Sequence, residues 1–165
     1  MLTNFKKQML WQDKYIPLVA RKLGEVFIVR SSFKVDTQNA TDLVMLHADK
    51  MNFAVRLRRL NKYGDRYLNQ FTIRAKTKNN KKTEIDKILE GYADYGIYAW
   101  VCEKNQRIKH WTIFDFDVFR QTFNKDKLNN KHLYMNQDDS GFYSFDFKEL
   151  PSNFVIQASI GEINE

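Results

Sequence analysis

The sequence predicts a single α/β (α+β) domain in which a mixed central β-sheet is flanked by helices and followed by a C-terminal β-hairpin. The chain has 165 residues, a length at which one domain can bury a substantial core. Hydrophobic residues make up 43% of it, so the chain is too apolar to stay disordered. Helical spacing and strand alternation follow one another along the sequence. We therefore expect one domain over residues 1–165.

The N-terminal segment predicts helices followed by two strands. Apolar residues recur near helical spacing over residues 5–23, and Pro17 should start a second helix or kink the first, because it lacks a backbone donor. Gly24 is expected to end the helix, and residues 25–29, which are apolar after Glu25, predict a strand. Residues 41–46 form a short apolar run that is typical of a strand covered on both faces.

Two strands with alternating polarity come next, at residues 53–58 and 71–76. Their odd-numbered positions are apolar and their even-numbered positions are mostly polar. Because side chains alternate across a strand, the basic residues of each strand share one face. We expect the two strands to be neighbours, so that their cations form one patch. These cations are Arg56, Arg58, Arg74 and Lys76.

The second half of the chain predicts alternating helices and strands. Thr83 is a good N-cap for a short helix, and acidic residues in its first turn suit the positive end of the helix dipole. Turn-forming residues between two aromatic segments predict a hairpin in a C-terminal extension of about 128–160. The expected elements are a helix over 84–90, strands over 96–102 and 108–114, a helix from about 115 to 123, and a hairpin turn at 138–141.

The charge of the chain points to an anionic partner. Lys and Arg number 27 against 20 Asp and Glu, which gives a net charge of +7. Between Lys50 and Lys82 there are eleven basic residues and one acid, Asp65. Grouping cations costs repulsion, which a bound phosphate backbone would relieve. We expect the basic patch to bind nucleic acid, with DNA favoured over RNA; a basic surface that serves solubility is the alternative.

Other features narrow the class of protein. No segment approaches the roughly 20 apolar residues of a membrane span, and the N-terminus has no signal-peptide pattern, so we expect a cytoplasmic protein without a membrane partner. No P-loop, GxGxxG, HExxH or GxSxG motif occurs.

Aromatic residues interleave with the basic segment, and we expect them in the strand core, with stacking on unpaired bases as the alternative. They are Phe53, Tyr63, Tyr67 and Phe71.

The order of these elements resembles the core of PD-(D/E)XK nucleases. A leading helix with an acid near its end precedes a strand that begins with Asp, then a strand with charged residues two apart, then a helix. The resemblance covers about residues 11–120, which are also similar to small phage and prophage proteins at the edge of that superfamily. It implies a restriction-endonuclease-like core. The segments that carry it are WQDKYIP, ATDLVML, FAVRLRR, FTIRAK, TEIDKILEGYADYGIYAW and IKHWTIFDFDVFR.

The resemblance also implies a catalytic site for Mg²⁺-assisted phosphodiester hydrolysis. It places Asp42 at the first metal-binding acid, preceded by Thr41 rather than Pro, and Arg58 at the catalytic lysine. Arg56 falls where the second acid stands, and a guanidinium cannot ligate Mg²⁺. Glu25 or a residue of the first helix is the further metal-binding acid that the resemblance suggests.

A displaced acid would complete such a site, and Asp36 and Glu84 are the available residues. Three functions stay open at this point. The first is a Mg²⁺-dependent nuclease that uses Asp42 with Glu25, Asp36 or Glu84. The second is an inert DNA- or RNA-binding module in which Asp42 forms a buried ion pair with Arg56. The third is a phage-type regulatory protein whose basic face binds an acidic host protein.

Overall fold

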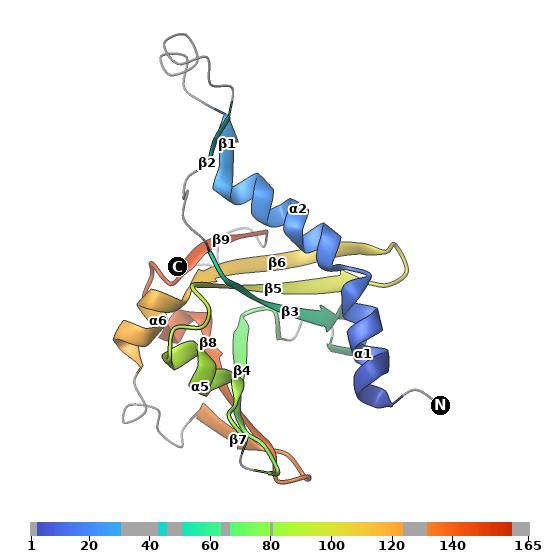
Figure 1. The fold of residues 1–165 in the computed structure, drawn as a ribbon, viewed down its shortest axis with the longest axis vertical. Helices are drawn as coiled ribbons and strands as arrows, with labels where there is room; N and C mark the ends of the chain where they lie inside the picture. The colour runs from blue at the N-terminus through green and yellow to red at the C-terminus, as the bar shows by residue number, and fades with distance from the viewer. Residues whose placement is uncertain are drawn as a thin grey trace.

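The described part of this computed structural model has an α+β fold built around two sheets (Figure 1). It comprises residues 3–30, 43–45, 51–63, 67–79, 81–123 and 132–159. The helices are α1 (Asn4–Asp13), α2 (Ile16–Phe27), α4 (Leu60–Tyr63), α5 (Glu84–Leu89) and α6 (Phe116–Thr122), with a 3-10 helix η3 (Phe147–Glu149). The strands are β1 (Ile28–Arg30), β2 (Leu43–Met45), β3 (Phe53–Arg59), β4 (Gln70–Lys76), β5 (Tyr95–Cys102), β6 (Arg107–Asp115), β7 (Leu133–Met135), β8 (Gly141–Asp146) and β9 (Val155–Ala158).

The larger sheet has four strands in the order β3-β5-β6-β9. It is mixed, because β3 runs parallel to β5 while β5, β6 and β9 pair antiparallel. The smaller sheet is antiparallel, in the order β4-β8-β7, and β7 with β8 forms the expected C-terminal hairpin. The mixed sheet, the β5–β6 strand pair and the hairpin are therefore confirmed, whereas β9 is a strand that the sequence patterns did not indicate.

The strands at 53–58 and 71–76 are not neighbours in one sheet, so that prediction is wrong. β3 pairs with β5, and β4 pairs with β8. The edge of β4 that points away from β8 is satisfied by side chains instead of a strand. The backbone N–H of Thr72 donates to the hydroxyl of Tyr98 at 2.9 Å, and that of Arg74 donates to the carboxylate of Glu84 at 3.1 Å. These bonds occupy the donors that a neighbouring strand would need.

The N-terminal predictions need two corrections. Gly24 does not end the helix, because α2 continues to Phe27, whose ring is buried against those of Phe53 and Tyr95 at centroid distances of 5.5 and 5.3 Å. The described residues 43–45 do not join the central sheet; they pair antiparallel with β1 as a separate ribbon. The prediction that Pro17 starts a second helix is confirmed, since it lies in the first turn of α2.

Each face of the larger sheet is covered by a different layer. Figure 1 shows α2 crossing one face, with β4, β8 and α5 on the opposite side. The cluster under α2 joins Tyr15, Val19, Phe27, Leu57, Ile97, Ala99, Val101, Trp111 and Ile113. The cluster between the sheets is rich in aromatic residues and is centred on Phe71, Tyr98, Trp100, Phe114, Phe119, Phe145 and Phe154. Within it, Gly96 lies against the ring of Phe114, and a Cβ at this glycine would overlap that ring.

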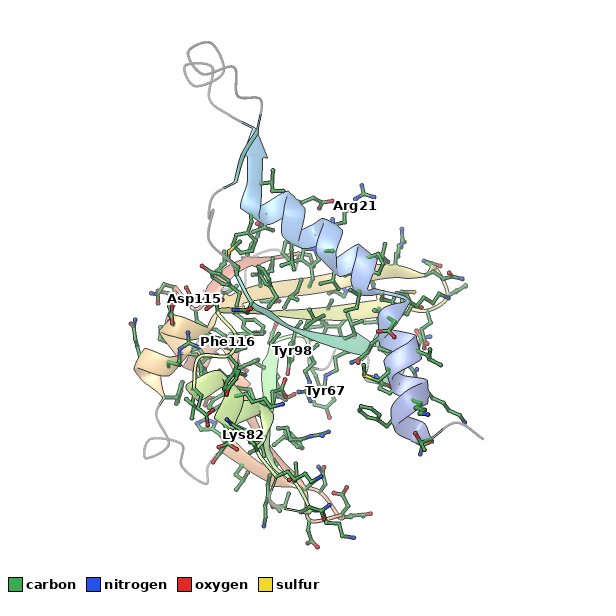
Figure 2. The ribbon with its side chains drawn as sticks, in the orientation of Figure 1. Arg21, Tyr67, Lys82, Tyr98, Asp115 and Phe116 are labelled. Carbon is green, nitrogen blue, oxygen red and sulfur yellow. The ribbon has the colours of Figure 1, made fainter. Side chains whose placement is uncertain are left out.

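The alternation of β3 decides where its arginines point. Leu57 is buried in the cluster under α2, and Phe53 and Val55 pack against the same cluster. Arg56 and Arg58 therefore face the other way, toward β4 and the ring of Tyr98. Figure 2 shows Tyr98 in this space between the sheets.

No helix in the described part of the chain is long and apolar enough to cross a membrane.

Candidate nucleic-acid interface

A pocket of about 490 Å³ lies where β3, β4, α1 and the start of α5 meet. Four of its lining residues are arginines and one is a carboxylate, which gives the lining an excess of positive charge. We call this site the arginine pocket. Its charged residues are Arg56, Arg58, Arg59, Arg74 and Glu84, and α1 contributes Gln8, Trp11 and Gln12.

Glu84 holds two parts of the pocket in place. Its Oε2 accepts a hydrogen bond from Nη1 of Arg56 and another, at 3.1 Å, from the backbone N–H of Arg74. The side chains of Arg56 and Glu84 are 25% and 34% exposed, so water screens this pair only in part. Glu84 therefore orients one guanidinium and fixes the edge of β4 at the same time.

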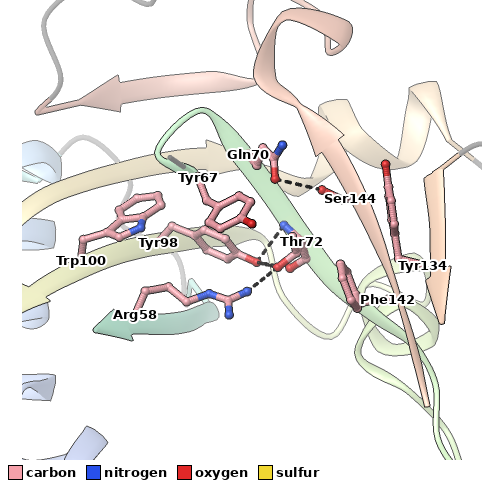
Figure 3. A pocket seen from close by; sticks show the side chains of 9 residues that line it. All are labelled: Arg58, Tyr67, Gln70, Thr72, Tyr98, Trp100, Tyr134, Phe142 and Ser144. Atoms are coloured by element: carbon pink, nitrogen blue, oxygen red, sulfur yellow. Dashed lines mark hydrogen bonds between the residues drawn. The ribbon is translucent and has the colours of Figure 1, made fainter. Parts of the chain in front are cut away.

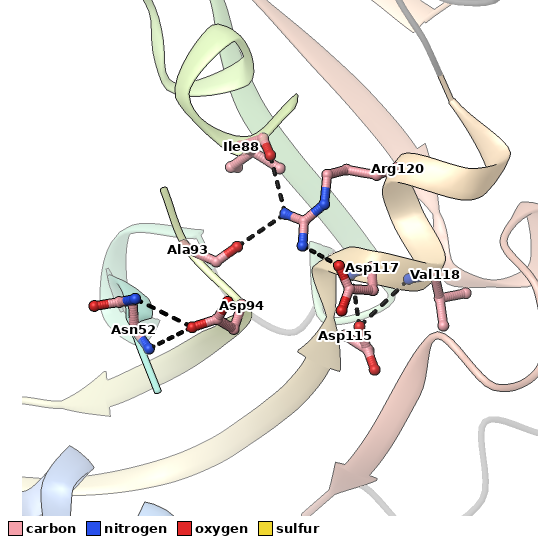
Figure 4. Close-up of polar contacts among 8 residues, drawn as sticks. All are labelled: Asn52, Ile88, Ala93, Asp94, Asp115, Asp117, Val118 and Arg120. Carbon is pink, nitrogen blue, oxygen red and sulfur yellow. Dashed lines mark hydrogen bonds and ion pairs between the residues drawn. The ribbon is translucent and has the colours of Figure 1, made fainter. Parts of the chain in front are cut away.

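Glu84 is itself fixed by the anchoring of α5. Before the helix, the N–H and the hydroxyl of Thr83 donate to the carboxylate of Asp86 at 2.9 and 2.8 Å. At its C-terminal end, Nη1 of Arg120 on α6 donates to the carbonyl oxygen of Ile88 in the last turn at 3.0 Å and to that of Ala93, beyond the helix, at 2.9 Å (Figure 4). A helix of six residues would fray if it were isolated, so these bonds at both ends define the position of its first residue.

Arg58 is oriented by β4. Its Nη2 donates to Oγ1 of Thr72 at 2.5 Å, and its guanidinium lies 5.9 Å from the centroid of the Tyr98 ring. The guanidinium of Arg56 lies at the same distance from that ring. The hydroxyl of Tyr98 in turn donates to the carbonyl oxygen of Thr72. Arg56 and Arg58 are thus held beside each other by contacts that fix their direction.

Arg59 joins the pocket to α1. Its guanidinium lies over the Trp11 ring at 4.5 Å, and the indole N–H of Trp11 donates to Oε1 of Glu103 at 2.7 Å. Nε of Arg59 is 3.5 Å from the same oxygen, an ion pair rather than a hydrogen bond. This cluster of three side chains places α1 at the rim of the arginine pocket.

A second pocket of about 530 Å³ adjoins the first, because Arg58 lines both. Figure 3 shows its side chains, which come from β3, β4, β5, β7, β8 and the segment before β4. We call it the aromatic pocket. It is lined by the aromatic residues Tyr67, Tyr98, Trp100, Tyr134 and Phe142 and by the polar residues Arg58, Gln70, Thr72 and Ser144.

Little in the sequence indicates the aromatic pocket. Among the interleaved aromatic residues, Phe71 is buried and Phe53 packs against a core, so the expectation of core residues is confirmed for these two. Tyr67 instead lines the aromatic pocket, as the alternative of a stacking surface would require. The side chain of Tyr63 lies outside the described residues. Tyr134 and Phe142 carried no signal, because only the pairing of β7 with β8 and of β8 with β4 brings them here.

The structure gathers three of the four basic residues expected in one patch. Arg56, Arg58 and Arg74 line the arginine pocket, whereas Lys76 is exposed further along β4 and lines neither pocket. The pocket forms although β3 and β4 belong to different sheets, because the two edge strands approach each other through their side chains.

The expected metal ligands do not come together among the described residues. Glu25 lies on α2 and pairs with Lys22 at 2.5 Å and with Arg21 at 3.3 Å; the hydrogen bond from Lys22 is the main reason that the pKa of Glu25 is lowered. Glu25 lines neither pocket. Asp42 and Asp36 lie outside the described residues, so their roles stay predictions.

The described lining of the arginine pocket suits an anion better than Mg²⁺. It offers one carboxylate, Glu84, and the guanidinium of Arg56 that bonds to this carboxylate would repel a cation. Over the described residues as a whole, no group of three or more His, Cys, Asp or Glu is placed to hold a metal ion. Ligation of Mg²⁺ by Asp42 therefore stays a prediction from the sequence resemblance.

Comparisons with known proteins identify no relative of this chain. No family model, curated protein or solved structure matches this chain.

Proposed function

We propose that this protein binds nucleic acid and that the arginine pocket holds backbone phosphate. The observation that supports this most directly is the collection of four arginines around one carboxylate in a single pocket. A guanidinium presents several N–H donors in a planar fork that matches the oxygens of a phosphate. The charge excess is local, and the net charge of +7 steers polyanions toward the protein from a distance.

The arginines of the pocket are prepared for this task in different ways. Arg56 and Arg58 are held by Glu84 and Thr72, so less conformational entropy is lost when they meet a ligand. Arg74 is exposed, and no described residue bonds to its guanidinium, so its donors face the solvent. A phosphate group that enters the pocket would therefore meet the oriented guanidinium groups of Arg56 and Arg58 together with the solvent-facing one of Arg74.

Cleavage of the bound strand is the second candidate function. The resemblance to PD-(D/E)XK nucleases favours it, and Arg58, Glu84 and Asp42 would then be the catalytic residues, with Mg²⁺ as the cofactor. Degradation of plasmid DNA that requires Mg²⁺ would support this function. DNA retention without cleavage would support an inert binding module at the edge of that superfamily, and indifference to DNA would favour an acidic protein partner.

The binding proposal is tested by fluorescence anisotropy with labelled DNA over a series of salt concentrations. Contacts to Z phosphates give a log-log salt slope of about −0.9Z for duplex DNA and about −0.7Z for single strands. Arg74→Ala should weaken binding and reduce the magnitude of that slope by about one unit. The matched control is Arg107→Ala, which removes an exposed arginine that lines neither pocket.

The outcomes of this experiment separate three cases. A loss in Arg74→Ala that exceeds the loss in Arg107→Ala supports a phosphate site in the arginine pocket. Equal losses would mean that only the net charge of the chain matters. Absence of binding by the folded wild-type protein at low salt would reject the proposal.

A further inference from the structure

We propose that the aromatic pocket takes up one unpaired nucleobase, so that the protein binds single-stranded nucleic acid in preference to duplex. This inference rests on the proposed function, because the base belongs to a strand whose phosphate lies in the arginine pocket. Arg58 lines both pockets and therefore stands where the base side and the phosphate side of one nucleotide meet.

The size and the walls of the aromatic pocket suit a flat ring system. Its volume of about 530 Å³ falls within the range of roughly 300–1,000 Å³ that small-molecule sites occupy. Tyr134 and Phe142 stack on each other at 5.6 Å with an angle of 16° between their planes. In Figure 3, Tyr134 and Phe142 lie on one side of Thr72. Tyr67 and Tyr98 lie on its other side. A base that enters between these groups meets aromatic faces.

Two of the tyrosines that line the aromatic pocket are partly exposed to solvent. Tyr67 is 41% exposed and Tyr134 is 53% exposed, although both line a pocket whose deeper residues, Tyr98 and Trp100, are buried. Exposed rings at the mouth of a hollow provide stacking surface, which all four bases can use because each has a π face. The buried pair beneath them gives the pocket a rigid floor.

Polar groups in the same pocket can contact the edge of a base. The hydroxyl of Ser144 donates to Oε1 of Gln70 at 3.5 Å, a long contact, and no described residue accepts from the amide nitrogen of Gln70. A side-chain amide carries both donor and acceptor groups, which is the pattern that base edges present. Gln70 is therefore placed to bond to a base whose faces are stacked.

The occupant must be unpaired. In a duplex both faces of each base are covered by its neighbours, so a paired base cannot offer a face to Tyr134 or Tyr67. Single-stranded nucleic acid presents its bases without that cost, while its phosphates remain available to the arginine pocket. The two adjoining pockets thus predict recognition of a strand rather than of a double helix.

The test compares three labelled probes by anisotropy at fixed salt: an oligothymidine, its duplex with oligoadenine, and an abasic oligomer with the same backbone. Wild-type protein should bind the oligothymidine about 5 to 150 times more tightly than the abasic oligomer, the gain that stacking of one base gives. It should also favour the oligothymidine over the duplex. Tyr134→Ala should lose most of the gain over the abasic oligomer, and Tyr67→Ala provides a second variant.

Controls separate this proposal from the proposed function. Tyr92→Ala removes another exposed tyrosine, which lies under Lys82 and outside both pockets, and should keep the preference for bases. Arg74→Ala should weaken all three probes alike. Equal affinity for oligothymidine and the abasic oligomer, or a preference for duplex, would overturn the base pocket but leave phosphate binding standing. Failure of all three probes to bind would overturn both proposals.

Discussion

Replacing Glu84 by Gln should lower stability and raise the affinity for nucleic acid in the same variant. The substitution keeps the shape of the side chain and removes its charge. In the structure this carboxylate accepts hydrogen bonds from Arg56 and from the backbone of Arg74. Both bonds go to a single oxygen, which in Gln carries no formal charge, so they lose their charge assistance and weaken.

The size of the stability change follows from the exposure of the pair. A hydrogen bond to a charged group contributes about 1.5–3 kcal/mol, but Gln keeps an acceptor and the partly exposed guanidinium of Arg56 regains water, so we expect a loss of about 1 kcal/mol. For a domain of this length that corresponds to a fall of about 2–4 °C in Tm. Glu90→Gln is the control, because the pair of Glu90 with Lys82 is more exposed and should contribute less than about 0.5 kcal/mol.

The binding change has the opposite sign. A carboxylate 4 Å from a bound phosphate repels it by about 1 kcal/mol in water, so Glu84→Gln should lower Kd about fivefold. Thermal unfolding by circular dichroism and DNA anisotropy on the same preparation measure the two effects. A folded Glu84→Gln variant whose Kd is unchanged or higher would refute the placement of phosphate beside this residue.

Three further predictions address the fold and the open question of catalysis. Gly96→Ala should destabilise the protein by about 1–3 kcal/mol, because the new methyl group overlaps the buried ring of Phe114; a Tm equal to that of wild type would show that the ring can move aside. The pKa of Asp138 is lowered chiefly by the hydrogen bond from the hydroxyl of Ser140. The stabilisation that the ionised Asp138 gives to the folded hairpin should therefore be fully present above the unfolded-state pKa of this carboxyl and lost as the pH falls through its folded-state pKa. An NMR titration that finds no lowering would contradict this. Asp42→Asn should abolish any Mg²⁺-dependent cleavage and leave DNA binding in place, whereas cleavage that persists would remove Asp42 from the catalytic site.

For the two alternating strands at 53–58 and 71–76, the sequence predicted which side is polar, because that depends only on the alternation of residues. Leu57 is buried and Arg56 and Arg58 point to the opposite side, as the period of two requires. The local signals for the helices also held where a capping residue was present, at Thr83 and at Asp115. Such signals act within a few residues, so one sequence is enough to read them.

The choice of strand partners could not be predicted in the same way. β4 is kept apart from β3 by the hydroxyl of Tyr98, which lies 26 residues from Thr72 in the chain, and by Glu84 on the following helix. The end of α2 could not be predicted for the same reason. Gly24 favours a helix end, but α2 continues to Phe27 because the ring of Phe27 is buried in the core. These contacts connect distant segments, and their cause is packing rather than local pattern.

The candidate site was predictable for its charge and not for its aromatic part. A dense run of basic residues is visible in the sequence, and three of the four arginines and lysines selected from it line one pocket. The aromatic pocket is assembled from six separate segments, none of which has a spacing that would set it apart from core. These residues come together only because β8 pairs with both β4 and β7, and the pairing with β4 could not be predicted from the sequence.

The position of β3 at the edge of its sheet has a consequence for how this protein behaves at high concentration. Among the described residues only β5 pairs with it, so its outer backbone groups could join a strand from another copy. Arg56, Arg58 and Arg59 place like charges along that strand, and two copies that approached edge to edge would repel each other. Charge-removing variants of this strand therefore expose the chain to self-association. Light scattering at several protein concentrations should accompany every such variant, so that aggregation is not mistaken for loss of binding.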